Sequence, residues 1–146
     1  MTSLDPVIRC ESVYKIFGAN AKKMLNDSNG NVDAKDFQDA GCIVGVNNAS
    51  FDVTRGEMLV VMGLSGSGKS TLLRCISRLT DATSGKIFID GQDLLSLKNK
   101  ELIELRRNKM GMVFQSFALL PHKTVLENIA FPLQIKGIKT NDSIMK

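Results

Sequence analysis

The sequence predicts an α/β fold, and three consecutive features in its middle part carry that prediction. Met58–Met62 is an unbroken apolar run, which is typical of a strand buried on both faces. A glycine-rich turn follows at residues 63–68. From Ser70 onward we expect a helix with one apolar stripe that packs on the sheet. The stripe consists of Leu72, Leu73, Ile76 and Leu79.

The residues before these features predict two strands separated by an insertion. Val7–Phe17 mixes β-branched and aromatic residues with polar ones and ends at a glycine, as a strand does when it enters a turn. Ile43–Val53 is the expected returning strand. Between them, residues 19–42 are interpreted as an insertion, in which Ala19–Leu25 and Asp33–Ala40 could each form a short helix. An unstructured loop is the alternative.

The residues after the helix predict a short strand, a helix, a second buried strand and a further helical segment. Lys86–Asp90 is expected to be a strand that ends in an Asp-Gly turn. Lys98–Arg107 has the pattern of a charged amphipathic helix. Met110–Phe114 is an apolar run of the buried-strand type, and Lys123–Ile138 has helical character.

The composition is that of an ordinary globular chain. Of the 146 residues, 43% are hydrophobic and 23% are charged, which excludes the disordered and fibrous classes. The longest stretch without a formal charge, residues 110–122, is well short of the roughly 20 apolar residues that a membrane-spanning helix needs. The N-terminus lacks the basic start and apolar core of a secretory signal, so we expect a cytoplasmic chain.

Neither the charge nor the cysteines predict a nucleic-acid or metal partner. The net charge is +4, but the basic residues are scattered, so no nucleic acid is expected as a partner. Cys10, Cys42 and Cys75 are odd in number and lack metal-ligand spacing. We therefore expect reduced, partly buried thiols without a chemical role.

Residues 63–70 fit the phosphate-binding pattern G-x-x-x-x-G-K-[ST] at every fixed position. Glycines let the backbone curl so that successive N–H groups point at phosphate oxygens, where a Cβ would obstruct the approach. Lys69 would reach the β- and γ-phosphates, and the hydroxyl of Ser70 would lie on Mg²⁺, at the positive end of a helix dipole. The residues predicted to line this P-loop are Gly63, Ser65, Gly66, Ser67, Gly68, Lys69, Ser70 and Thr71.

Three runs of the sequence, in matching order and spacing, resemble ABC ATPases. They are residues 56–74 around the P-loop, residues 83–91 and residues 112–128. The resemblance implies an α/β P-loop NTPase fold of the ABC ATPase type, with an N-terminal β-subdomain, an incomplete RecA-like core, and ATP and Mg²⁺ as ligands. It makes residues 1–122 the N-terminal part of a nucleotide-binding domain and residues 123–146 the start of its helical subdomain.

The resemblance also implies roles for residues outside the P-loop. Gln115 would begin the Q-loop, where its amide helps to hold Mg²⁺ and the attacking water. Lys69 and Gln115 are therefore the implied catalytic residues, and Ser70 and Gln115 the implied metal ligands. Adenine would stack on Phe17, since stacking needs only the π face of a ring. Tyr14 is the competing aromatic residue, and a place in the core is the alternative for either ring.

The chain is still more similar to the ATPases of glycine betaine and proline importers, from Tyr14–Gly18 through the spacer and the P-loop to Met112–His122. This implies an ATP-binding subunit that couples ATP hydrolysis to uptake of a quaternary-amine osmoprotectant such as glycine betaine, proline or choline. Its implied partners are integral-membrane transport subunits and a second ATPase subunit. The implied location is cytoplasmic and peripheral, on the inner face of the cell membrane.

Motifs that a complete ABC ATPase needs are missing from the sequence. These are an apolar strand ending in Asp-Glu, a signature of the Leu-Ser-Gly-Gly-Gln type, and a switch histidine, since the single His122 belongs to the Q-loop region. We therefore interpret the chain as a fragment or truncated gene product that binds nucleotide without significant turnover of its own. An ABC ATPase for another solute, and a cassette protein that acts on DNA or ribosomes, are the alternatives.

Overall fold

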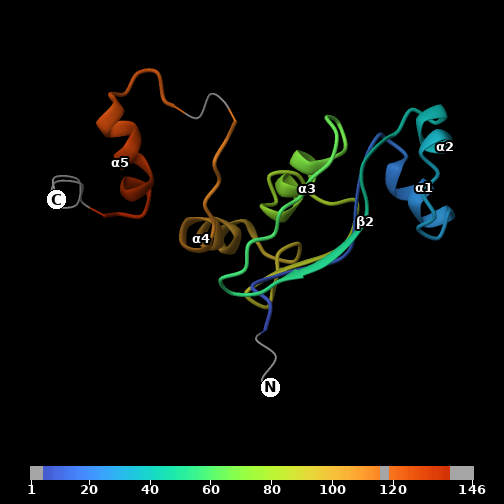
Figure 1. The fold of residues 1–146 in the computed structure, drawn as a ribbon, viewed down its shortest axis with the longest axis horizontal. Helices are drawn as coiled ribbons and strands as arrows, with labels where there is room; N and C mark the ends of the chain where they lie inside the picture. The colour runs from blue at the N-terminus through green and yellow to red at the C-terminus, as the bar shows by residue number, and fades with distance from the viewer. Residues whose placement is uncertain (1–4, 116–118, 139–146) are drawn as a thin grey trace. The chain divides into compact units, whose positions relative to one another are not determined.

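The computed structural model describes residues 5–115 and 119–138 of the chain. These residues fall into two compact units, the first ending at Leu97 and the second beginning at Lys98. Among the described residues, the first unit holds the P-loop sequence together with the sheet and the helices α1, α2 and α3 (Figure 1). Within the described residues, no helix is long and apolar enough to cross a membrane.

An antiparallel sheet is the framework of the first unit, with strand order β2-β1-β3-β4. Figure 1 shows β2 running along β1 for most of its length. Ile8 pairs with Val53 at one end of these two strands, and Phe17 pairs with Ile43 at the other. The strand bounds are β1 Ile8–Phe17, β2 Ile43–Val53, β3 Ser84–Ile89 and β4 Gln92–Asp93. The predicted strand pair and the predicted short strand with its Asp-Gly turn are confirmed.

Alternating burial along the central strands builds the core of the first unit. Val13 and Ile87 are fully enclosed, and Ile16 and Ile89 are nearly so. Helix α3, Lys69–Ile76, packs against β1 and β2 and contributes the buried side chains of Leu72 and Cys75. Burial of such side chains removes apolar surface from water, which is the main favourable term in folding.

The predicted apolar stripe on this helix is only partly correct. Leu72 is buried, but Leu73 is 52% exposed, and Leu79 lies beyond the end of α3 and is 50% exposed. The helix ends early because the hydroxyl of Ser77 bonds back to the carbonyl oxygens of the preceding turn, and Arg78 then adopts a left-handed backbone conformation with φ +53°. The chain therefore turns away before the last leucine can join the stripe.

Residues 19–42 form two short helices with a core of their own. Helix α1 spans Ala21–Asp27 and α2 spans Ala34–Asp39, close to the bounds predicted for them. The Asp33 carboxylate caps α2 by accepting hydrogen bonds from the N–H groups of Lys35 and Asp36. Both helices pack at one end of β1 and β2 (Figure 1). The buried residues of this core are Tyr14, Ile16, Ala21, Leu25, Phe37 and Cys42.

The two predicted buried strands are wrong for the part of the chain that the structure describes. Met58–Met62 and Met110–Phe114 carry no strand pairing, and their side chains lie open, with Met58 86% and Val113 100% exposed. An apolar run becomes a buried strand only when neighbouring strands supply hydrogen bonds and cover both faces. Among the described residues, the sheet is wholly antiparallel and consists of other segments.

The described residues of the second unit form two helices, as predicted from the sequence. Helix α4 spans Asn99–Lys109 and α5 spans Val125–Ile135. In α5 the hydroxyl of Thr124 accepts from the N–H of Glu127, while the Glu127 carboxylate accepts from the N–H of Thr124. This reciprocal capping satisfies two amide groups that would otherwise lack partners at the helix start.

We predict that Ile87→Ala lowers the free energy of unfolding of the chain by about 2–5 kcal/mol, because it leaves a cavity at a fully enclosed position. Urea titration followed by circular dichroism measures the change. Ile43→Ala in β2 is the control, since Ile43 is 69% exposed, and it should cost less than about 1 kcal/mol. Equal costs for the two variants would show that the sheet is not packed as described.

Candidate functional site

The P-loop leads directly into α3 through a tight turn. The N–H of Ser67 donates to the carbonyl oxygen of Leu64, and the N–H of Leu72 donates to that of Gly68, which starts the helix. Gly66 and Gly68 have left-handed backbones, with φ +79° and +90°, a conformation that glycine adopts without steric cost. A Cβ at Gly63 would lie 2.7 Å from the hydroxyl oxygen of Ser67. Glycine is therefore required at these positions for conformation or for space.

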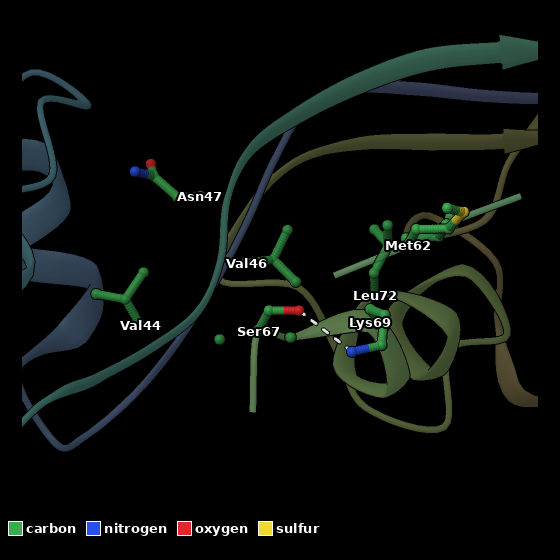
Figure 2. A pocket seen from close by; sticks show the side chains of 10 residues that line it. Val44, Val46, Asn47, Met62, Ser67, Lys69 and Leu72 are labelled. Atoms are coloured by element: carbon green, nitrogen blue, oxygen red, sulfur yellow. Dashed lines mark hydrogen bonds between the residues drawn. The ribbon is translucent and has the colours of Figure 1, made fainter. Parts of the chain in front are cut away.

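The ammonium group of Lys69 lies within the turn of the P-loop. Its Nζ donates to the carbonyl oxygen of Gly63 at 2.8 Å, to that of Leu64 at 2.6 Å, and to the hydroxyl of Ser67 at 3.3 Å. Figure 2 shows Ser67 and Lys69 joined by the last of these bonds. A positive charge and the N-terminus of α3 thus meet in one small space, which favours an anion there.

The P-loop rests on β2 through a backbone contact. Gly68 lies against the carbonyl oxygen of Gly45, so closely that a Cβ at Gly68 would overlap that oxygen. A cavity of about 340 Å³ opens beside this contact (Figure 2). Its volume lies at the lower end of the range usual for small-molecule pockets. The lining residues are Val44, Gly45, Val46, Asn47, Val61, Met62, Ser67, Gly68, Lys69 and Leu72.

Phe17 lies beside the first turn of α3. Its ring is 43% exposed, and the Lys15 ammonium lies 4.8 Å from the ring centroid. A Cβ at Gly45 would be 3.0 Å from both the Phe17 ring edge and the Thr71 methyl group, so ring and methyl approach the same point of β2. The aromatic residue and the P-loop are therefore close together in the first unit.

Tyr14 occupies the opposite face of β1. It is 8% exposed, belongs to the core of the 19–42 segment, and donates its hydroxyl hydrogen to the carbonyl oxygen of Gly30 at 3.1 Å. Because successive side chains of a strand point to opposite faces, Lys15 and Phe17 face α3 while Tyr14 and Ile16 face the other core. Phe17, rather than Tyr14, is therefore the exposed aromatic ring beside the P-loop.

Residues 46–146 match the family model described as ABC transporter. The chain belongs to the ABC transporter family. The resemblance found in the sequence is thereby confirmed, and so is the α/β fold of the ABC ATPase type in partial form. A dimeric structure of the ATP-binding cassette MJ0796 in a post-hydrolysis state, bound to ADP and Pi, aligns with a TM-score of 0.72 and 31% identity, over 94% of this chain and 52% of that one.

Several relatives of this ABC chain are ATP-binding proteins of trimethylamine N-oxide or glycine betaine transport systems. It is 89% identical over 142 residues to the trimethylamine N-oxide transport system ATP-binding protein TmoW of Pelagibacter ubique, covering 97% of this chain and 42% of the relative. It is 58% identical to TmoW of Ruegeria pomeroyi, over 91% of this chain and 39% of the relative. It is 41% identical to the glycine betaine/proline betaine transport system ATP-binding protein ProV of Escherichia coli, over 92% of this chain and 34% of the relative. The chain thus spans less than half the length of these curated relatives.

The remaining predicted site residues of the ABC chain are placed as follows. Ser65 and Ser70 are exposed, one in the P-loop and one in the first turn of α3. Gln115 belongs to the second unit, so its role beside Mg²⁺ stays a prediction. The β2 residues at the cavity, above all Gly45, were not predicted from the sequence. A glycine between two valines in a strand was the available signal, because such a glycine often marks a close approach.

The three cysteines of the ABC chain are buried thiols. Burial raises the pKa of the Cys10 thiol to about 11, with smaller contributions from Cys75 and Asp52. Burial also raises the pKa of Cys75, against a smaller opposing effect of Lys15. A thiol with a raised pKa stays protonated at neutral pH, so Cys10 and Cys75 pack as small apolar side chains.

We predict that Gly68→Ala destabilises the chain more than Gly66→Ala. Both changes force an alanine into a left-handed backbone, at a cost of about 1–2 kcal/mol. Only at Gly68 does the added methyl group also overlap the Gly45 carbonyl, whereas nothing lies within 4 Å of a Cβ at Gly66. Urea titration of both variants measures the difference. Equal destabilisation would mean that the P-loop is not held against β2.

Proposed function

We propose that this chain carries the nucleotide-binding part of the ATP-binding subunit of an ABC importer, and that trimethylamine N-oxide is the imported solute. The single observation that carries the proposal is the 89% identity to the trimethylamine N-oxide protein of Pelagibacter ubique over nearly the whole chain. The second trimethylamine N-oxide relative, at 58%, is also more similar than the glycine betaine proteins, which range from 41% to 48%. Trimethylamine N-oxide and glycine betaine both contain a methylated nitrogen, so the two groups of relatives are named for chemically similar solutes.

ATP is the proposed ligand of the P-loop. The open space beside Gly66 and the N-terminus of α3, where backbone N–H groups lack helical partners, suit phosphate oxygens. In the structure, the Lys69 ammonium group donates hydrogen bonds to two neutral carbonyl oxygens. Phosphate oxygens of ATP would take the place of these acceptors and form stronger, charge-assisted hydrogen bonds. The Ser70 hydroxyl and the Gln115 amide are the proposed Mg²⁺ ligands, and Gln115 with Lys69 the proposed catalytic pair. Mg²⁺ would neutralise part of the phosphate charge.

The base of ATP is proposed to stack on Phe17. The exposed ring stands beside the first turn of α3, and the N-terminus of that helix would hold the phosphates. Lys15 covers one face of the ring as a cation–π contact, which leaves the other face for the base. Because stacking involves only the π faces, the site should accept adenine and guanine similarly.

The partners and location follow as parts of the same proposal. An ATP-binding subunit acts on membrane-embedded transport subunits, so the chain would sit at the inner face of the membrane without entering it. A second ATPase subunit would complete the site. We assign residues 1–122 to the nucleotide-binding domain, including the inserted helices at 19–42, and residues 123–146 to the start of the helical subdomain.

Transport by hybrid proteins tests the solute assignment. Residues 5–138 of this chain would replace the matching segment of the Pelagibacter ubique protein in one hybrid and of ProV in another. Cells that depend on the first hybrid should take up labelled trimethylamine N-oxide at a rate close to that with the parent protein. Restoration of glycine betaine uptake by the ProV hybrid, without restoration of trimethylamine N-oxide uptake by the first, would contradict the assignment.

Replacing the P-loop lysine tests the phosphate site. We expect Lys69→Ala to weaken Mg-ATP binding by about 10- to 100-fold, the usual loss for a hydrogen bond to a charged group. Isothermal titration calorimetry on the purified chain measures the affinity. Lys23→Ala on the exposed surface of α1 is the matched control and should leave the affinity unchanged. Undiminished binding by the Lys69 variant would rule out the P-loop as the phosphate site.

Replacing each aromatic residue tests the base contact. We expect Phe17→Ala to weaken ATP and GTP binding alike by about tenfold, since a stacked base is worth about 1–3 kcal/mol. Tyr14→Phe removes only a hydroxyl that bonds to Gly30, so it should leave nucleotide affinity unchanged. Undiminished affinity of Phe17→Ala for both nucleotides would show that Phe17 does not carry the base.

A further inference from the structure

Strand β2 contains a glycine that its backbone conformation does not explain. Gly45 stands between Val44 and Val46 in a strand, and its φ lies outside the left-handed region that favours glycine. Glycine inside a strand weakens it, because it gives up more conformational freedom than other residues and offers no side chain to pack. The reason for this glycine is therefore the space around it.

Three parts of the proposed nucleotide site converge on that space. A Cβ at Gly45 would lie 3.0 Å from Cε2 of Phe17 and 3.0 Å from the methyl carbon of Thr71, tighter than nearly all real contacts of a Cβ atom. The carbonyl oxygen of Gly45 supports Gly68, the last glycine of the P-loop. One residue of β2 thus contacts the aromatic ring, the phosphate loop and the first turn of α3.

We propose that Gly45 is a positioning residue of the nucleotide site, which holds the Phe17 ring and the P-loop at the separation that a single ATP molecule requires. The inference rests on the proposed function, because it concerns the same site. The base and the phosphates of ATP are linked through one ribose, so the ring that stacks the base and the loop that holds the phosphates must be held in register. Displacement of either by even a fraction of an ångström weakens a ligand that must contact both.

The neighbours of Phe17 also restrict the position of its ring. Lys15 lies over one ring face, and the ring edge meets Gly45 beside Thr71. The ring therefore has support at one face and at one edge, and its position follows the backbone of β2. A side chain at position 45 would push the ring and α3 apart rather than fill an empty space.

The test compares two ligands of the same loop. Tripolyphosphate contains the phosphate chain without the base or ribose, so it contacts only the P-loop. We expect Gly45→Ala to weaken Mg-ATP binding by about tenfold, while tripolyphosphate binding changes less than about twofold, both measured by calorimetry on the purified chain. A merely structural role for Gly45 would weaken both ligands equally. Gly111→Ala is the matched control, because Gly111 also lacks a positive φ and nothing lies within 4 Å of its Cβ position.

A second substitution relieves the crowding. Thr71→Ser removes the methyl group that a Cβ at Gly45 would meet and keeps the hydroxyl. In the Gly45→Ala background, Thr71→Ser should restore at least half of the lost ATP affinity. The reference for this comparison is the ATP affinity of the Thr71→Ser variant in which Gly45 is unchanged. Thermal unfolding of each variant establishes that it is folded.

The outcomes separate this inference from the proposed function. Failure of the unchanged chain to bind ATP would overturn both. Normal ATP binding by the unchanged chain, with equal losses for ATP and tripolyphosphate in Gly45→Ala or with no loss at all, would overturn the role of Gly45 alone. A Gly45→Ala chain that stays unfolded even with Thr71→Ser would also overturn it, since Gly45 would then serve the fold itself.

Discussion

The contact between Gly68 and the carbonyl oxygen of Gly45 is the constraint on which the site depends. It places the end of the P-loop against β2, and it is possible only because Gly68 has no side chain at that point. Helix α3 starts directly after this contact, so its N-terminal N–H groups and Lys69 face the P-loop. The backbone, rather than a set of charged side chains, therefore fixes where an anion can be held.

The two faces of β1 separate structural support from the candidate site. Tyr14 and Ile16 enter the core formed with α1 and α2, while Lys15 and Phe17 face α3. A Cβ at Gly18 would be 2.5 Å from the sulfur atom of Cys42, so the strand ends are packed tightly just beyond the ring. The inserted helices hold the end of β1 from one side, and Phe17 is presented on the other.

The sequence predicted those parts of the molecule whose signals are local. The P-loop follows from eight consecutive residues, and the β1–β2 pair and the short helices follow from the spacing of polar and apolar residues. Met58–Met62 shows the limit, because its apolar run specifies a strand but not the neighbours that would pair with it. Gly45 was missed for the same reason: its partners Phe17 and Thr71 are distant in sequence. The preference for Phe17 over Tyr14 likewise required knowing which core each strand face meets.

A crystal structure of the chain with Mg-ADP tests the account most directly. We predict the β-phosphate within the turn of residues 63–70, beside the Lys69 ammonium, and the adenine ring on the exposed face of Phe17, with Gly45 between the two. Nucleotide bound away from the P-loop, or a base that stacks elsewhere while Phe17 stays uncovered, would contradict it.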